Sequence, residues 1–326
     1  MKGLWLGWVA GLGALDLGDE APWAGSCADC HDKDHEEWAA SGHARAWRND
    51  LMVAGYAMEP LAFCQSCHAP LPAQQAEIRA NHAWYVSLDP TSAIPAGSVE
   101  RLPERRADEG VTCAVCHWRD GVILAPSVSG LAPHPVRATP ELRSADFCMT
   151  CHDFQVAETR DGTTSFAASM MQATGQEWRA WGGGQTCQDC HMPSGRHRFA
   201  GVHDREALRR ALSVEVDGGE LVLASVGVGH HLPSGDVFRH LTVEVADGDG
   251  WRVVDWIGRR FDVARGSDGR WHQELVVDTA LRPGVPRRVR LPAGARWRVV
   301  WHDVSDREEA AGLLDVADVT EVLAGG

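Results

Sequence analysis

Cys27-Ala-Asp-Cys30-His31 is the first of five copies of one pattern, Cys-x-x-Cys-His, in this chain of 326 residues. The other copies are Cys64-Gln-Ser-Cys67-His68, Cys113-Ala-Val-Cys116-His117, Cys148-Met-Thr-Cys151-His152 and Cys187-Gln-Asp-Cys190-His191. Together they use all ten cysteines of the chain. Because His makes up about a twentieth of the residues, five coincidental placements after the second Cys have odds of roughly one in a few million. The pattern therefore reflects a chemical requirement.

Cys-x-x-Cys-His is the attachment signal of haem c. The two thiols bond covalently to the porphyrin, and the imidazole that follows becomes the proximal ligand of the iron. Five copies predict five covalently attached haem c groups, with all ten cysteines bound to the cofactors. The predicted proximal ligands are His31, His68, His117, His152 and His191.

Other chemistries of paired cysteines fit this pattern less well. A zinc ribbon uses two Cys-x-x-Cys knuckles for each ion, so five knuckles would leave one unmatched. Zinc also gives no reason for a His after every second Cys. A thioredoxin-type motif is expected once, at the start of a helix in a βαβ unit. We therefore retain the haem interpretation.

The spacing of the motifs predicts the architecture of the first domain. Successive first cysteines are 37, 49, 35 and 39 residues apart, so that the five motifs span residues 27–191. A segment this short cannot bury five macrocycles beneath a conventional apolar core. We expect a haem domain over residues 26–205, in which short helices and loops wrap the cofactors, and we expect the chain without haem not to fold.

Composition excludes some classes of partner. The chain has 45 acidic and 31 basic residues and a net charge of −14, which repels nucleic acid. Only Lys2 and Lys33 are lysines, so nearly every cation is a guanidinium. Guanidinium groups suit the carboxylates of haem propionates, which they can bind through two hydrogen bonds.

The N-terminal residues 1–25 resemble a secretory signal peptide. Lys2 precedes an apolar, Gly-rich run over residues 3–15, which is too short to span a bilayer. A mis-assigned start codon or a retained anchor is the alternative. The rest of the sequence has no second apolar run of membrane length, so the mature chain is expected to have no integral membrane span. We expect a periplasmic or extracellular protein.

The sixth ligand of each iron decides whether that iron has a coordination position open to a substrate. The segment after the first motif carries Trp38-Ala-Ala-Ser41-Gly-His43 on a predicted helix. It resembles the multihaem c-type cytochromes related to the tetrahaem electron acceptor of hydroxylamine oxidoreductase, which carry Trp-x-x-Ser-x-His at this place. The resemblance implies that His43 is a distal haem ligand. A solvent-facing helix His is the alternative.

Two later segments resemble the same group of cytochromes. After the last motif, Cys-His-Met-Pro is followed by His197 and His203, and the resemblance implies that one of them reaches back to a haem; we favour His203. The segment 229–235 resembles a Gly-His-x-x-Pro-Ser-Gly signature found where multihaem cytochromes join a β domain. It implies that His230 approaches a haem, with a turn exposing two imidazoles as the alternative.

His82 and His134 are candidates by position alone, since they are the unassigned histidines between the second and fourth motifs. A core or surface His explains either equally simply. The predicted distal set is then His43, His82, His134, His203 and His230, one for each iron. A Met ligand is less favoured, because the Met residues lie in apolar contexts where they fill gaps.

Beyond the motifs the sequence changes in character. Residues 206–326 lack cysteine and alternate in short runs broken by Gly and Asp, which predicts a β-sandwich. The expected strands are 212–216, 220–226, 240–246, 251–257, 271–277, 287–291 and 297–302, with a short helix and a final strand over 306–323. The whole chain is thus expected to be α+β, with a multihaem domain followed by a β domain.

These observations favour a pentahaem electron carrier with bis-His irons, which serves redox protein donors and acceptors. Related exported cytochromes polymerise into extracellular haem filaments, so self-association is a further hypothesis. The alternative is an oxidoreductase that acts on a small nitrogen compound at one haem with an open position. That alternative has less support, because no Cys-x-x-Cys-Lys variant occurs.

A third hypothesis is a β-sandwich docking module that carries haems incidentally. It predicts an exposed aromatic patch on the β domain. The tryptophans that would form it are Trp251, Trp256, Trp271, Trp297 and Trp301. We expect these rings instead to fill the interior of the sandwich.

Overall fold

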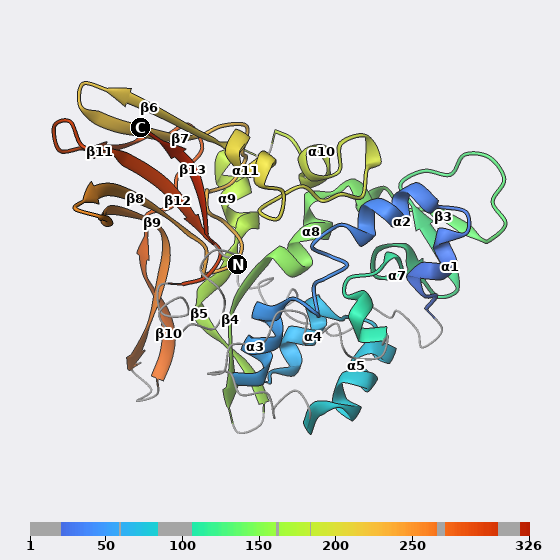
Figure 1. Ribbon diagram of the computed structural model, residues 1–326. Helices are drawn as coiled ribbons and strands as arrows, with labels where there is room; N and C mark the ends of the chain where they lie inside the picture. The colour runs from blue at the N-terminus through green and yellow to red at the C-terminus, as the bar shows by residue number, and fades with distance from the viewer. Residues whose placement is uncertain are drawn as a thin grey trace, which may run out of the picture. The chain divides into compact units, whose positions relative to one another are not determined.

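A computed structural model describes residues 21–58, 60–83, 106–160, 163–182, 184–265, 271–305 and 320–326 (Figure 1). Most of the predicted signal peptide, residues 1–20, lies outside the described residues. The chain divides into two compact units. Among the described residues, the first unit holds those up to 83, 106–150 and 186–203, and the second holds 151–185 and those from 204 onward.

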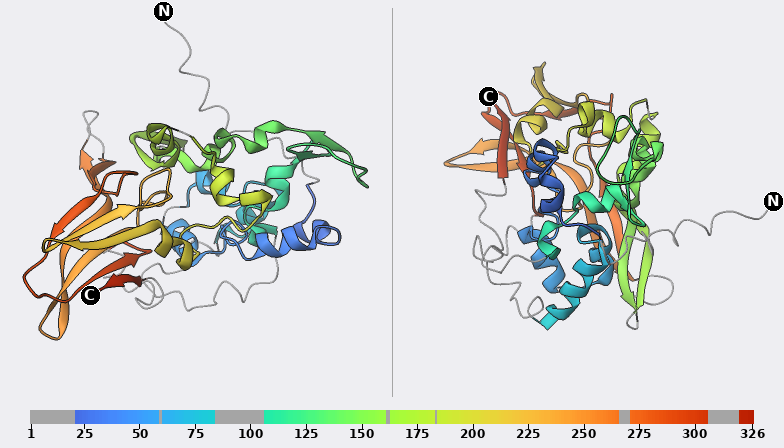
Figure 2. Two further views of the ribbon diagram at one scale, coloured as in Figure 1. Left: turned by 90° about the horizontal axis from the view of Figure 1, so that it is seen from above. Right: turned by 90° about the vertical axis from the view of Figure 1, so that its right-hand side faces the viewer.

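The first unit consists of short helices connected by turns, with one small sheet (Figure 2). Its elements are α1 (Ala24–Ala28), α2 (Asp32–Ala39), α3 (Asp50–Met58), α4 (Ala62–His68), α5 (Pro72–Ala80), η3 (Arg106–Glu109), α7 (Cys113–His117), β1 (Trp118–Arg119), β2 (Val122–Ala125), β3 (Val136–Ala138), η4 (Pro140–Arg143), α8 (Ala145–His152), α10 (Cys187–His191) and η5 (Pro193–Gly195). The helix α8 continues into the second unit from Cys151 onward. None of the described helices combines the length and the apolar composition needed to cross a bilayer.

The apolar interior of the first unit is divided into small clusters. One contains Trp47, Tyr56, Ala69, Ile78 and Ala107. The others centre on Leu71 with Val115 and on Trp38 with Ala44. Each of these clusters is small compared with one continuous core of a domain.

Hydrogen bonds join the segment that precedes the third motif to the segment that follows the first motif. Trp38 donates from Nε1 to the carbonyl oxygen of Val111 at 2.8 Å, and the Val111 amide donates to the His43 carbonyl oxygen at 2.9 Å. Gly110 has a φ of +56°, and a Cβ built on it would lie 2.5 Å from that same oxygen. The backbone at His43 is therefore fixed by contacts that only glycine at position 110 permits.

The second unit is rich in β structure, which confirms the α+β class (Figure 1). It contains the hairpin β4–β5 (Asp153–Arg160 and Thr163–Ala173), the helices α9 (Thr174–Trp181) and α11 (Arg205–Ala211), and two antiparallel sheets. One sheet has the order β10-β9-β8-β12-β13 (Trp271–Asp278, Gly250–Arg265, His240–Asp247, Trp297–His302, Thr320–Gly325), and the other has the order β11-β7-β6 (Arg287–Arg290, Glu220–Ser225, Leu212–Asp217).

All seven strands expected from alternation are present, and six of them lie within a few residues of their predicted bounds, whereas β9 continues eight residues beyond its predicted end to Arg265. The final strand also forms as β13, whereas the helix expected before it falls in residues 306–319, outside the described residues. The hairpin β4–β5 was not expected. It belongs to the β-rich unit although its residues lie inside the predicted haem domain, 26–205.

The strands of the second unit are positioned by fully buried aliphatic residues, among them Leu221, Leu241 and Val299, each with no exposed surface. Trp301 is also fully buried, and its Nε1 donates to Asp303 at 2.8 Å. Arg287 on β11 donates from one terminal nitrogen to Asp255 on β9 at 2.7 Å, and so bridges the two sheets. These contacts support the predicted sandwich.

Candidate haem sites

Each of the five motifs lies on or beside a short helix. The helices α4, α7, α8 and α10 end at the motif His, and α1 contains the first Cys of its motif. On a helix, residues three and four positions apart lie on one face. Both thiols and the imidazole of a motif can therefore meet one planar group, as haem c attachment requires. All ten thiols are free of disulfides.

The motifs approach one another in pairs within the first unit. Cys27 and Cys113 share a hydrogen bond between their sulfur atoms, which lowers the pKa of the Cys27 thiol to about 7. A hydrogen bond with Cys148 likewise lowers the pKa of the Cys187 thiol to about 7. The first motif thus lies against the third, and the fourth against the fifth. The same contact raises the pKa of the Cys113 thiol, so that in the first pair only Cys27 gains thiolate, the nucleophilic form of Cys.

Backbone carbonyls orient three of the motif imidazoles. The Nδ1 atom of His68 lies 2.8 Å from the Ala46 oxygen, and that of His117 lies 2.7 Å from the Leu124 oxygen. His191 makes the same contact with the Ala200 oxygen. Because a carbonyl only accepts, Nδ1 carries the proton and Nε2 carries the lone pair. A histidine that ligates a metal commonly donates its other N–H in this way, so these residues fit an iron at Nε2.

The surroundings of His117 favour the form that binds metal. Burial is the main cause that lowers its pKa. A lowered pKa keeps the imidazole neutral, and only the neutral ring has a lone pair for iron. The remaining motif histidines, His31 and His152, are more exposed.

The predicted distal residue His43 lies in a group of rings. Its ring meets Phe199 edge-on, with centroids 4.3 Å apart. The ring of His203 lies against Gly42, where an added Cβ would be 2.9 Å from its Cδ2 atom. The structure thus brings the two predicted ligands His43 and His203 into one neighbourhood.

His230 lies in the second unit, on a turn held by a buried carboxylate. Its Nδ1 atom is 2.8 Å from the oxygen of His231, so it presents Nε2 like the motif histidines. Glu177 is only 6% exposed and accepts from the His231 amide at 3.2 Å and from the Ser234 hydroxyl at 2.6 Å. The buried Glu177 thus holds the turn that carries His230. His82 and His134 are exposed side chains of the first unit.

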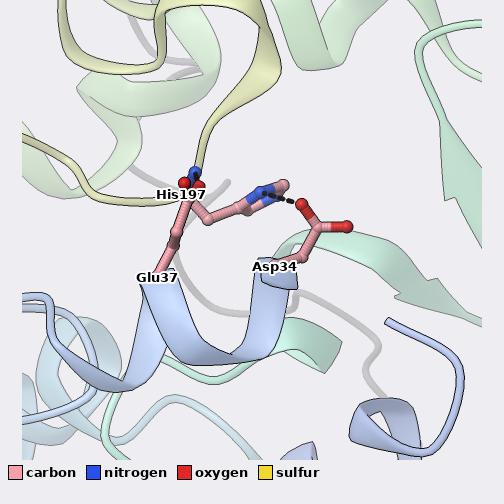
Figure 3. Close-up of side chains that lie close together, drawn as sticks. All are labelled: Asp34, Glu37 and His197. Carbon is pink, nitrogen blue, oxygen red and sulfur yellow. Dashed lines mark hydrogen bonds and ion pairs between the residues drawn. The ribbon is translucent and has the colours of Figure 1, made fainter. Parts of the chain in front are cut away.

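Sequence reasoning missed two carboxylates that flank His197 (Figure 3). Asp34 and Glu37 lie three residues apart on α2, with one oxygen of Asp34 3.2 Å from Nδ1 of His197. Glu37 accepts from the His197 amide at 2.8 Å and from Nε of Arg196 at 2.7 Å. These bonds hold the pKa of Glu37 below its usual range. The spacing of Asp34 and Glu37 on a predicted helix was the available signal, but it named no partner 160 residues away.

No protein-family model matches the chain, and no curated protein matches it. Among solved structures, the chain is similar to a penta-haem cytochrome c552 from Thermochromatium tepidum, with a TM-score of 0.63 and 20% sequence identity. The match covers 94% of this chain and 98% of that one. The two chains share a fold. That likeness includes the β-rich C-terminal region as well as the motif-bearing part, because almost nothing of either chain lies outside it.

Proposed function

We propose that this protein is an electron carrier with five covalently bound haem c groups. The observation that carries the proposal is the repeated unit of the site, which is a Cys-x-x-Cys-His on or beside a helix. Among the described contacts, Nδ1 of the motif His is bonded to a backbone carbonyl at His68, His117 and His191. The fold shared with a penta-haem cytochrome supports it. When bound, haem c supplies an iron centre that gains and loses one electron.

The chain's own residues hold and close the irons. The ten motif cysteines attach the cofactors, and the motif histidines bind the irons from one side. For the other side we propose His43, His82, His134 and His230, together with one of His197 and His203. An iron with two imidazoles has no position for a substrate, so bis-His ligation suits a carrier and disfavours catalysis at the metal.

The pairing of motifs supports transfer along the chain. Because Cys27 meets Cys113 and Cys148 meets Cys187, the attachment points form two close pairs rather than five isolated sites. Cofactors attached at neighbouring sulfur atoms are close to one another. This arrangement favours a relay between partner proteins over a single catalytic centre.

Export and partners follow from the same proposal. A signal peptide would deliver the chain to the periplasm or the cell exterior, which are compartments where c-type cytochromes can meet redox proteins. The partners are therefore proposed to be protein electron donors and acceptors. A filament would require more, namely a distal His supplied by a neighbouring copy of the chain.

Spin state tests the proposal against the oxidoreductase alternative. Protein matured in a host that attaches haem c should show only low-spin ferric signals in electron paramagnetic resonance. The reduced form should not bind carbon monoxide. A high-spin signal together with carbon monoxide binding would establish an open iron and favour the enzyme that acts on a nitrogen compound.

A further inference from the structure

We propose that His197 is the sixth ligand of the iron held by His117, and that Asp34 and Glu37 on α2 hold His197 in place. The inference rests on the proposed function, because it needs a haem at the third motif. Of the two histidines that follow the last motif, it selects His197 over His203 as the distal ligand. It also gives the two carboxylates a role as positioning residues.

The separation of the two imidazoles fits one shared metal. The ring centroids of His117 and His197 are 6.1 Å apart. A metal–imidazole bond of about 2 Å plus a ring radius of about 1.1 Å on each side predicts roughly 6.2 Å between centroids. By contrast, His240 and His302 stack in parallel with centroids 4.3 Å apart, which leaves no room for an atom between them.

Each ring also has an oxygen near the nitrogen that would not bind iron. Nδ1 of His117 lies 2.7 Å from the Leu124 oxygen, and Nδ1 of His197 lies 3.2 Å from Asp34. His117 therefore presents Nε2 as its ligand atom. Nδ1 of His197 is buried beside the Asp34 carboxylate and has no hydrogen-bond partner among the described residues. A carboxylate at this place is the usual outer partner of a metal-bound imidazole, which it would orient through Nδ1 with Nε2 toward the iron.

Glu37 fixes the backbone that carries the ring. It accepts from the amide of His197 at 2.8 Å and binds the guanidinium of Arg196 with a closest distance of 2.7 Å. Both oxygens of Glu37 are thus occupied by residues that follow the last motif. This commitment argues against a separate cation held by Asp34, Glu37 and His197, although their ligand atoms lie within 4.8 Å of one another.

The same helix connects this ligand to the first motif. The second oxygen of Asp34 lies 3.8 Å from Nδ1 of His31, the proximal ligand of the first haem. Cys27 and Cys113, from the same two motifs, share a hydrogen bond. One carboxylate therefore lies between ligands of the first and third irons, at the place where their attachment sites meet.

The test replaces His197 with alanine in the matured protein and measures haem content and spin state separately. We expect five haems per chain, with one of the five converted to high spin and returned to low spin by added imidazole. Five low-spin haems in His197→Ala would overturn the inference and leave the proposed function standing. Absence of haem from the parent protein would overturn both.

The pairing with His117 needs a second background. In a chain without the third haem, made by Cys113→Ala with Cys116→Ala, adding His197→Ala should create no new high-spin haem. A new high-spin signal there would place His197 on another iron and overturn the pairing. If His197→Ala fails to fold, His197→Met supplies another ligand and should raise the midpoint potential of one haem. Five unchanged potentials would contradict the proposal.

The carboxylates are tested with matched controls on the same helix. Asp34→Asn should keep five haems and raise the midpoint potential of the third haem and, to a smaller extent, that of the first, because Asp34 lies 3.2 Å from Nδ1 of His197 and 3.8 Å from Nδ1 of His31. The exposed Asp32→Asn and Glu36→Gln serve as controls and should change no potential. Glu37→Gln should broaden the low-spin signal of one haem. Stoichiometric zinc bound by the parent protein and lost in Asp34→Asn, with no change of potential, would show a separate cation site instead.

Discussion

Individual imidazoles in this chain are oriented by distant partners. Nδ1 of His68 meets the carbonyl oxygen of Ala46, 22 residues earlier, and the backbone amide of His197 donates to Glu37 on α2. The motif pattern suffices to predict which imidazoles bind from the proximal side, because spacing alone fixes that chemistry. It leaves the choice between His197 and His203 open, because that choice depends on which segment packs beside each ring.

Gly110 offers a test of how rigidly His43 is held. Gly110→Ala should lower the free energy of unfolding by about 1–3 kcal/mol, because its Cβ would meet the His43 carbonyl and its φ is positive. Thermal or denaturant unfolding of the matured protein measures the change. Gly121 also has a positive φ but open space around it, so Gly121→Ala should cost less. Equal losses in both variants would show that the contact does not matter.

At the scale of elements, the sequence patterns predicted the strands of the two antiparallel sheets but not the hairpin β4–β5. The strands β6 to β12 follow apolar and polar residues that alternate between Gly and Asp turns, and all were predicted. The hairpin β4–β5 was not predicted, because haem motifs lie on both sides of residues 153–173 and these residues were therefore assigned to the haem domain. Its sequence does contain a signal, the hairpin dipeptide Asp161-Gly162 between two alternating runs.

Each motif helix should attach its haem independently. Replacing Cys187 and Cys190 with alanine should reduce the haem content from five to four per chain, since neither sulfur remains to bond the porphyrin. The pyridine haemochrome assay, combined with the protein concentration, measures this ratio. A content still equal to that of the parent protein would show that α10 does not carry a haem.

At the scale of the whole molecule, the two units differ in what fills them. The second unit is packed by buried aliphatic side chains on its strands, whereas the first contains small separate clusters. The α+β class and the β-rich C-terminal region could be predicted because composition and periodicity change near residue 212. The assignment of residues 151–185, which begin within the fourth motif, to the β-rich unit could not, because motif spacing carries no information on packing.

Removal of the haems should therefore affect the first unit most. Chain produced in a host without haem c maturation should lose helical circular dichroism relative to the matured protein and unfold at lower temperature. The reason is that the apolar clusters among the described residues are small, so that side chains alone would offset little of the conformational entropy of so many short helices. An unmatured chain with unchanged helix content and melting temperature would contradict this expectation.

The most direct test of the whole account is the intact mass of the matured, denatured chain. We predict the mass of the polypeptide, less any cleaved leader, plus five haem groups that stay attached through denaturation, since thioether bonds survive it. A chain that migrates at its bare polypeptide mass, without haem staining or Soret absorbance, would contradict the account.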